Sequence, residues 1–199
     1  MTATWMIGFG FLLGSIPFSV WLGRLTLQED IRRYGVDLNP GAANAWRAGK
    51  WKLGVPVLLL DFCKGAFPVG VAHYTFGITG WSLVPVALAP VFGHIFSPFL
   101  KFRGGKGLAV TFGMWTGLTL AEGPLVLGGI LSVLILLLSS NAWALMIGML
   151  LYLIFLILRC FGANIIVIWL LNMLLLFWRH RQELNQPLHL HPRIKNLLR

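Results

Sequence analysis

Long hydrophobic stretches separated by short polar segments set the organisation of this chain. A helix that crosses a lipid bilayer needs about 20 mostly apolar residues. Residues 108–158 contain a single charged residue, Glu122, and turn-forming residues divide this region at 122–124 and again at 139–141. The pattern therefore predicts seven membrane-spanning helices, three of them within this region and the others at Thr2–Gly23, Leu53–Phe76, Trp81–Leu100 and Ala163–Trp178.

The composition excludes most soluble classes of protein. The 199 residues are 57% hydrophobic and 11% charged, with a mean hydropathy of +0.79. A soluble fold of this size could not bury so much apolar surface, which excludes a soluble enzyme, a disordered protein and a secreted disulfide scaffold. Cys63 and Cys160 lie in apolar stretches and predict neither a disulfide framework nor a zinc cluster. We expect an all-α membrane protein with one transmembrane domain over residues 1–199, in which residues 183–199 form a loosely ordered cytoplasmic tail.

The positions of the basic residues predict the orientation in the membrane. Sixteen Lys and Arg against six Asp and Glu give a net charge of +10. Fourteen of these 16 basic residues fall in three segments, 24–52, 101–107 and 179–199, which seven spans would place on one face. The positive-inside rule assigns that face to the cytoplasm, so we expect the N-terminus outside and the C-terminus in the cytoplasm. Because these residues flank apolar stretches, an anionic leaflet or an anionic substrate fits them better than nucleic acid.

The longest polar segment, residues 24–52, contains a turn that leads into a predicted helix. Asn39, Pro40 and Gly41 form a strong turn signal, because proline fixes φ and glycine allows a positive φ or a close backbone approach. The residues from there to Arg47 look helical, so the amide groups at this helix start could face a ligand. The alternative is a solvated loop with an interfacial helix that is held on anionic lipid.

A second cytoplasmic segment surrounds a lysine with glycines. Gly104, Gly105, Lys106 and Gly107 precede the fourth predicted span directly. Exposed amides in such a loop can approach an anion closely, with the lysine as a point charge and the helix dipole adding to the attraction. The spacing is not that of a Walker A motif. The alternative is a flexible basic turn that obeys the positive-inside rule, but such a turn does not need three glycines.

Several polar side chains lie within the predicted spans. His94 is about two turns from the glycine-rich segment, which suggests a functional role, although a buried histidine bonded to a backbone carbonyl is the common case. Asp61 and Lys64 are i, i+3 neighbours and indicate an intramembrane ion pair rather than direct catalysis. Ser15 lies beside Pro17, where its hydroxyl could satisfy freed backbone groups or where a small residue only assists packing.

The C-terminal end offers less specific signals. Residues 178–181, which include His180, follow the pattern of an interfacial anchor, and His189 and His191 indicate a solvated tail rather than a metal site. The sequence has no Gly-x-Ser-x-Gly motif, no cysteine with a nearby histidine and no acidic pair at metal-ligand spacing, so neither a covalent acyl-enzyme nor a metal mechanism is supported. Cationic, glycine-rich segments at the cytoplasmic surface instead suit two phosphate-bearing substrates, at least one of them lipidic.

Together these segments resemble the bacterial acyl-phosphate:glycerol-3-phosphate acyltransferase family. The matching segments are Gly14–Phe18, Asp30–Gly35, Asn39–Arg47, Asp61–Gly65, Gly93–Phe96, Lys101–Gly107 and Arg179–Arg181. The resemblance implies a seven-helix enzyme of the cell inner membrane that moves a fatty acyl group from acyl phosphate to the 1-hydroxyl of glycerol 3-phosphate. The product would be lysophosphatidic acid for phospholipid synthesis. We expect a monomer that needs no cofactor or metal, with its active site on the cytoplasmic side.

The resemblance also implies which residues act. The catalytic residues would be Lys106, Arg47 and His180, and the substrate-binding residues would be Ser15, Asn39, Gly41, Asn44, His94, Gly104, Gly105 and Gly107. Acyl phosphate is a mixed anhydride with a good leaving group, so positioning and electrostatic stabilisation suffice. No dedicated general base is evident, and in the family a phosphate oxygen of the donor is thought to accept the proton.

Three departures from the family pattern keep other functions open. Val36 or Asp37 replaces a serine, Ala43 replaces a threonine, and Glu183 replaces a common asparagine. An acidic side chain near the site would repel phosphate unless a cation neutralises it. The alternative is a membrane protein that binds a lipid phosphate without catalysis or that uses a different acceptor. A transporter is the third alternative, although the chain shows no internal repeat.

Overall fold

The computed structural model describes residues 1–35, 38–192 and 194, and within these residues the chain is helical, with one isolated β-bridge and no β-strand. Among the described residues, five helical segments are long and apolar enough to cross a membrane: Thr2–Leu27, Ala42–Thr75, Gly80–Leu100, Asn141–Leu158 and Ala163–Leu184. Two shorter apolar helices, α5 (Leu108–Thr119) and α6 (Glu122–Leu137), occupy the remaining hydrophobic stretches. The predicted all-α membrane class is thereby confirmed. The chain forms two compact units, Met1–Leu118 and Thr119–Arg199.

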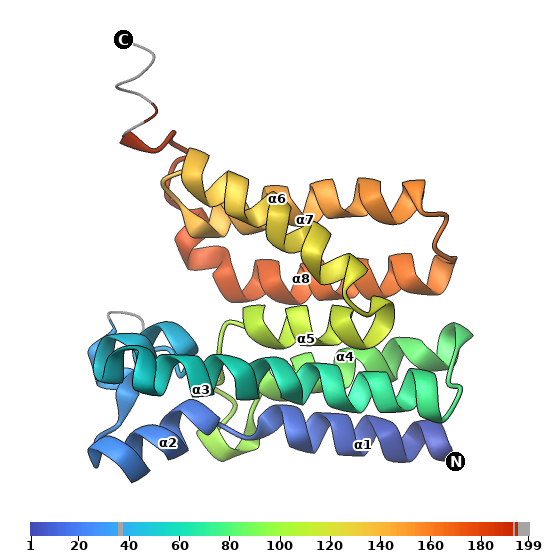
Figure 1. The fold of residues 1–199 in the computed structure, drawn as a ribbon, viewed down its shortest axis with the longest axis horizontal. Helices are drawn as coiled ribbons and strands as arrows, with labels where there is room; N and C mark the ends of the chain where they lie inside the picture. The colour runs from blue at the N-terminus through green and yellow to red at the C-terminus, as the bar shows by residue number, and fades with distance from the viewer. Residues whose placement is uncertain (36–37, 193, 195–199) are drawn as a thin grey trace. The chain divides into compact units, whose positions relative to one another are not determined.

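The first unit contains α1 (Thr2–Ser15), α2 (Phe18–Leu27), α3 (Ala42–Gly70), α4 (Leu83–Ile95) and α5. Short helical turns connect them: η1 (Ile31–Tyr34), η2 (Val71–Thr75), η3 (Gly80–Ser82) and η4 (Pro98–Leu100). Within this unit α1 packs along both α3 and α4, and α2 packs on α3 (Figure 1). Small residues allow close approach, as is common in membranes. A Cβ at Gly14 would overlap the carbonyl of Pro90 in α4, and one at Gly113 would overlap the carbonyl of Phe62 in α3.

The first predicted span, Thr2–Gly23, falls within the candidate span Thr2–Leu27, but the helix is interrupted inside it. It breaks between α1 and α2, where Ile16 has an extended backbone with φ −61° and ψ 120°. The physical reason is Pro17, which has no amide hydrogen and disfavours the helical conformation in the residue before it. The Ile16 amide still donates to the carbonyl of Leu13 at 3.3 Å. The carbonyl groups that the break releases need partners elsewhere in the fold.

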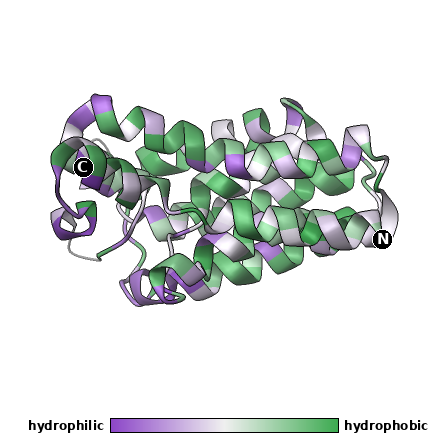
Figure 2. Ribbon diagram, turned by 90° about the horizontal axis from the view of Figure 1, so that it is seen from below, coloured by the Kyte–Doolittle hydropathy of each residue, from purple (hydrophilic) through white to green (hydrophobic). Residues whose placement is uncertain are grey.

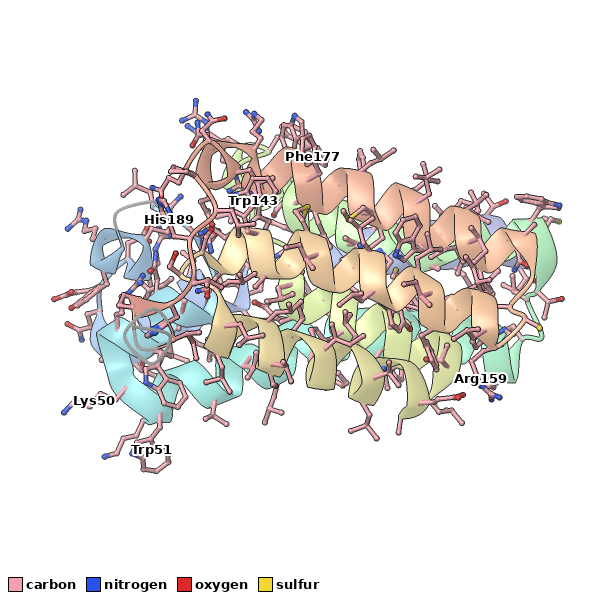
Figure 3. All side chains as sticks on the ribbon, turned by 90° about the horizontal axis from the view of Figure 1, so that it is seen from above. Lys50, Trp51, Trp143, Arg159, Phe177 and His189 are labelled. Carbon is pink, nitrogen blue, oxygen red and sulfur yellow. The ribbon has the colours of Figure 1, made fainter. Side chains whose placement is uncertain are left out.

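The second unit contains α6, α7 (Asn141–Leu158) and α8 (Ala163–Leu184). The predicted divisions at residues 122–124 and 139–141 fall at the starts of α6 and α7. Ser140 caps α7 by accepting a hydrogen bond from the Trp143 amide at 3.5 Å, as serine commonly does before a helix. Arg159, which lies at the opposite end of α7 from Trp143 (Figure 3), pairs with Glu122 at 2.7 Å.

Part of the expected loose tail is held by hydrogen bonds within the second unit. The segment Gln186–His191 follows α8 and runs beside the turn between α6 and α7. Ser139 donates from its amide to the His189 carbonyl at 3.0 Å, and Trp143 Nε1 donates to the Gln186 carbonyl at 2.8 Å. The His191 amide donates to the Leu137 carbonyl at 2.8 Å. Residues 193 and 195–199 lie outside the described part of the chain.

Apolar side chains cover the outside of the helices. Figure 2 shows hydrophobic residues along the helix bodies, whereas most hydrophilic residues gather at helix ends and in the connecting segments. Exposed large side chains include Trp5, Phe67, Leu125, Leu158 and Leu174. In water such a surface would drive aggregation, but in a bilayer it contacts lipid tails. The distribution of hydropathy therefore agrees with an integral membrane protein.

Asp30 stabilises the turn η1, which follows α2. Its carboxylate accepts a hydrogen bond from the Arg32 amide at 3.1 Å and another from Arg32 Nη2 at 2.6 Å. The Arg32 guanidinium lowers the pKa of Asp30 from 3.8 to about 2, against a smaller opposing effect of burial. The turn buries Ile31 completely against side chains near the start of α3. Asp30 therefore helps to hold the start of α3 in place.

We expect the Asp30→Asn variant to be less stable than the wild type at neutral pH, by about 1–2 kcal/mol. Because the folded-state pKa of about 2 lies below the ordinary 3.8, ionised Asp30 stabilises the fold above about pH 4. This contribution is lost as the pH falls towards the folded-state pKa. Thermal unfolding in detergent at pH 7 and pH 3 measures the effect, and the Tm difference between the two proteins should shrink at pH 3. An equal difference at both pH values would contradict this role for Asp30.

Candidate active site

The segment from Asn39 to Arg47 forms a turn and a helix start, as the sequence predicts. Gly41 is the residue that precedes α3, and Pro40 receives a hydrogen bond on its carbonyl from the buried Ser19 hydroxyl at 2.9 Å. Asn44 is buried, and its Nδ2 donates to the Asn39 carbonyl at 2.9 Å. Arg47 Nη1 donates to Asn44 Oδ1 at 2.6 Å. These contacts form a chain from the turn to the exposed guanidinium of Arg47.

This part of α3 ends at a kink. Gly49 and Lys50 leave the helical conformation, with φ 51° at Lys50, so the first turns of α3 differ in direction from the long apolar part. Lys50 and Trp51 project outward beside the kink (Figure 3). The predicted interfacial helix is therefore compatible with this geometry, because an exposed tryptophan beside lysines is typical of a membrane surface. Arg47 therefore lies in the short helical part before the kink and not in the long apolar part of α3.

The residues from Gly104 to Gly107, called the glycine loop below, connect η4 to α5. The Gly104 amide donates to the Ile95 carbonyl at 3.0 Å, and the Gly105 amide donates to the His94 carbonyl at 3.1 Å. A Cβ at Gly104 would overlap the His94 carbonyl oxygen, and one at Gly105 would overlap the His94 ring. Gly107 has φ 86°, which favours glycine.

These contacts correct one part of the sequence interpretation. The amides of Gly104 and Gly105 are not exposed donors, because they bond to the carbonyl groups at the end of α4. Glycine is required at both positions because the loop packs directly on His94. This packing fixes the backbone of the loop immediately before Lys106, whose side chain is partly buried.

A recess with about 190 Å³ of empty space, part of it open to solvent, lies where these segments meet. It is lined by Ser15, Ile16, Pro17, Pro40, Asp61, Lys64, His94, Ser97, Leu100 and Gly105. Of the predicted site residues, Ser15, His94 and Gly105 therefore line one recess. Pro40, which stands between the predicted residues Asn39 and Gly41, joins them there. The turn before α3 and the glycine loop thus meet at one end of the first unit.

The wall of the recess carries buried charges. Lys64 Nζ lies 2.7 Å from Asp61 Oδ1, and both side chains are at most 4% exposed. This confirms the ion pair that the sequence predicts within the span. His94 Nδ1 lies 4.0 Å from the same carboxylate oxygen. Ser15 donates its hydroxyl to the Phe11 carbonyl of its own helix at 2.7 Å, so it satisfies a backbone group beside the proline break.

Among the other positions that the sequence singles out, His180 and Glu183 belong to the second unit, Ala43 belongs to the first, and two residues lie outside the described part of the chain. His180 is buried in α8, and its Nδ1 lies 3.4 Å from Glu183 Oε2, one turn further along the same helix. Val36 and Asp37 lie outside the described residues. Ala43 is exposed and precedes Arg47 by one helical turn.

Sequence reasoning did not identify Ser97 or Ser19, whose hydroxyls bond to backbone carbonyls of other elements. No spacing marks either residue, because their partners are distant in the chain. The sequence predicts the ion pair of Asp61 and Lys64, but only the fold brings these residues to the same recess as the glycine loop. Among the described residues, no three side chains of His, Cys, Asp or Glu gather closely enough to hold a metal ion.

The fold and the recess define a helical integral membrane protein with a polar site at one end of its first unit. The sequence profile of the glycerol-3-phosphate acyltransferase family matches residues 4–189. A protein of Thermotoga maritima named glycerol-3-phosphate acyltransferase 1 is 37% identical over 197 residues, which cover 92% of this chain and 96% of that protein. A glycerol-3-phosphate acyltransferase of Thermus thermophilus is 37% identical over 186 residues, covering 92% and 90% of the two chains.

Solved structures agree with these relatives. The crystal structure of PlsY, an integral membrane glycerol 3-phosphate acyltransferase, in its glycerol 3-phosphate form matches with a TM-score of 0.85 and 30% identity, over 100% of both chains. Its lysophosphatidic acid form matches with a TM-score of 0.82 and 30% identity, over 93% of this chain and 91% of that one. The chain therefore belongs to the glycerol-3-phosphate acyltransferase family, and it is a membrane acyltransferase. A non-catalytic lipid-phosphate-binding protein is not favoured.

Proposed function

We propose that the protein transfers a fatty acyl group from acyl phosphate to the 1-hydroxyl of glycerol 3-phosphate and releases lysophosphatidic acid and inorganic phosphate. One observation carries this proposal: the turn before α3 and the glycine loop line one recess through Pro40 and Gly105, and a cationic residue is close to each of them in the sequence, Arg47 after the turn and Lys106 within the loop. Two phosphate-bearing substrates need positive charge from more than one direction. The family membership agrees with this substrate pair.

In this proposal the charged residues bind phosphate, and the polar and glycine residues shape the site. Lys106 provides a point charge for phosphate, and Arg47, held by Asn44, offers a planar guanidinium that suits phosphate oxygens. Asn39 and Gly41 shape the turn, and Gly107 provides the backbone conformation that the loop needs before α5. Gly104 and Gly105 position the loop on His94, and Ser15 closes the recess at the α1 break. The role that the resemblance gives to His180 stays a prediction.

The reaction itself needs little from the protein besides alignment and charge. The acceptor oxygen attacks the carbonyl carbon of acyl phosphate, a new C–O ester bond forms, and the bond between that carbon and the phosphate oxygen breaks. The phosphate leaves with the bonding electron pair, and a phosphate oxygen of the donor takes the hydroxyl proton. Lysine and arginine side chains stabilise the negative charge that grows on the phosphate. This scheme needs no separate general base and no metal.

We also propose how the protein lies in the membrane. The short apolar helices α5 and α6 would add two crossings to the five longer segments, giving seven. The cationic segments 24–52 and 101–107 would then lie in the cytoplasm together with the C-terminus, and the N-terminus would lie outside. The active site would open at the cytoplasmic surface of the cell inner membrane, where phosphorylated substrates are dissolved. A monomer contains all the residues that this scheme uses.

The proposed function can be tested with purified protein in detergent. Palmitoyl phosphate is supplied with and without glycerol 3-phosphate, and both inorganic phosphate and lipid products are measured. We expect phosphate release to depend on glycerol 3-phosphate and to equal the lysophosphatidic acid formed. Release that is independent of the acceptor, or palmitoyl phosphate binding without any product, would contradict the proposal.

A further inference from the structure

Two irregular segments of the first unit, distant in the chain, are joined by buried side chains. At the break after α1, the carbonyl groups of Ser15 and Ile16 leave the helix, and the Ile16 carbonyl accepts a local hydrogen bond from the Phe18 amide at 3.1 Å. Ser97 Oγ donates to the Ser15 carbonyl at 2.6 Å, and Lys64 Nζ donates to the Ile16 carbonyl at 3.0 Å. The shape of this break therefore depends on side chains from α3 and from the segment after α4.

The segment after α4 also holds the chain that leads into the glycine loop, and the end of α4 holds the loop itself. The Phe102 amide donates to the carbonyl of Ser97 at 2.8 Å, and the Gly105 amide donates to the carbonyl of His94 at 3.1 Å. His94 faces α3, because its Nδ1 lies 4.0 Å from Asp61 Oδ1. Ser97 thus contacts the break through its side chain and the loop segment through its backbone. A shift of the break would be transmitted to the loop through this residue.

Stability alone gives no reason for the charges in this arrangement. Lys64 and Asp61 are almost completely buried, 2.7 Å apart. Replacing a buried ion pair by apolar side chains of similar size is often neutral or stabilising. Charged side chains are also costly inside a membrane span. What the pair adds here is a strong hydrogen-bond donor, fixed in position by the carboxylate and directed at the Ile16 carbonyl.

We propose that Lys64 and Ser97 are positioning residues for acyl transfer, which fix the break after α1 and the glycine loop relative to each other, while Asp61 holds the Lys64 ammonium in place. This inference rests on the proposed function, in which Lys106 of that loop contacts phosphate. Lys64, Ser97 and Asp61 act through the loop and not on the reacting atoms. Since a misplacement of about 1 Å can reduce a rate by about 100-fold, a looser loop should slow the reaction.

Two kinds of variant test the inference. Ser97→Ala removes the donor to Ser15 with little change in volume. The double variant Asp61→Asn with Lys64→Met removes the donor to Ile16 without leaving an unpaired buried charge. For protein that is folded by gel filtration and thermal unfolding, we expect kcat to fall at least about tenfold in each. The KM for glycerol 3-phosphate should stay within about threefold, because Lys106 and Arg47 are unchanged.

A matched control neutralises the ion pair of the second unit. Glu122→Gln with Arg159→Met removes a pair that is also 2.7 Å long but exposed, and its kcat should equal that of the wild type. An equal loss in this control, or a raised KM at unchanged kcat in the test variants, would overturn the inference. If the Asp61 and Lys64 double variant does not fold, Ser97→Ala alone decides. If the wild type is active and Ser97→Ala has the same kcat, only this inference is overturned. If the wild type shows no acceptor-dependent phosphate release, the proposed function is overturned as well.

Discussion

Replacement of Lys106 by alanine is expected to lower kcat/KM for acyl transfer by at least about 100-fold. Lys106 follows two glycines whose amides are bonded to the end of α4, so its backbone position is fixed before substrate arrives. Removing the ammonium takes away a charge that the proposed transition state needs. The measurement is the rate of phosphate release from palmitoyl phosphate in the presence of glycerol 3-phosphate.

The matched control for this variant is His189→Ala. His189 is an exposed residue of the C-terminal segment, and its hydrogen bonds with Ser139 use its backbone carbonyl, which alanine retains. We expect this variant to keep wild-type activity and stability. Equal activity of the Lys106→Ala variant and the wild type would remove the glycine loop from the proposed mechanism.

Gly104→Ala should reduce activity almost as strongly and should also destabilise the fold. Its Cβ would overlap the His94 carbonyl oxygen and would lie 2.7 Å from the Ile95 carbonyl oxygen. Both are backbone atoms of α4, so the loop itself must move. We expect a loss of about 1–3 kcal/mol in the free energy of unfolding, as for other overpacked sites, and a fall in kcat of about 100-fold. Thermal unfolding and the phosphate-release assay measure the two effects separately.

Gly129→Ala is the control for adding a methyl group to a glycine. Gly129 lies in α6 with nothing within 4 Å of its added Cβ. Alanine favours the helix by up to about 1 kcal/mol relative to glycine, so this variant should be active and at least as stable as the wild type. If Gly104→Ala behaved in the same way, the packing of the loop on His94 would not matter for the reaction.

Much of the helical organisation could be read from the sequence because membrane helices leave a strong local signal. The divisions before α6 and α7 follow from turn-forming residues at 122–124 and 139–141, and the start of α3 follows from the Asn39-Pro40-Gly41 turn. Each of these features depends on residues that are close together in the chain. The i, i+3 spacing that predicts an ion pair is local as well, and the contact between Asp61 and Lys64 confirms that prediction.

The parts that sequence reasoning missed depend on contacts between distant residues. The proline at position 17 was visible, but the donors that satisfy the break after α1 are 48 and 82 residues from the carbonyls they contact. The sequence pattern predicts that the glycines of the loop expose amides to a ligand, whereas two of them are required because the loop packs on the backbone and ring of His94. No local sequence pattern distinguishes an amide that is free to bind phosphate from one that donates to a backbone carbonyl.

The broken first helix also bears on how the chain enters the membrane during synthesis. α1 has 14 residues, and at about 1.5 Å per residue it is about 21 Å long, shorter than the roughly 30 Å of a hydrocarbon core. The carbonyl groups that end it are satisfied by Lys64 and Ser97, which leave the ribosome much later. Until both have been translated, the Ser15 carbonyl depends on water, lipid headgroups or the translocon, and the Ile16 carbonyl has only its local hydrogen bond from the Phe18 amide at 3.1 Å. The break after α1 therefore gains its full set of hydrogen bonds only after the first half of the polypeptide has been translated.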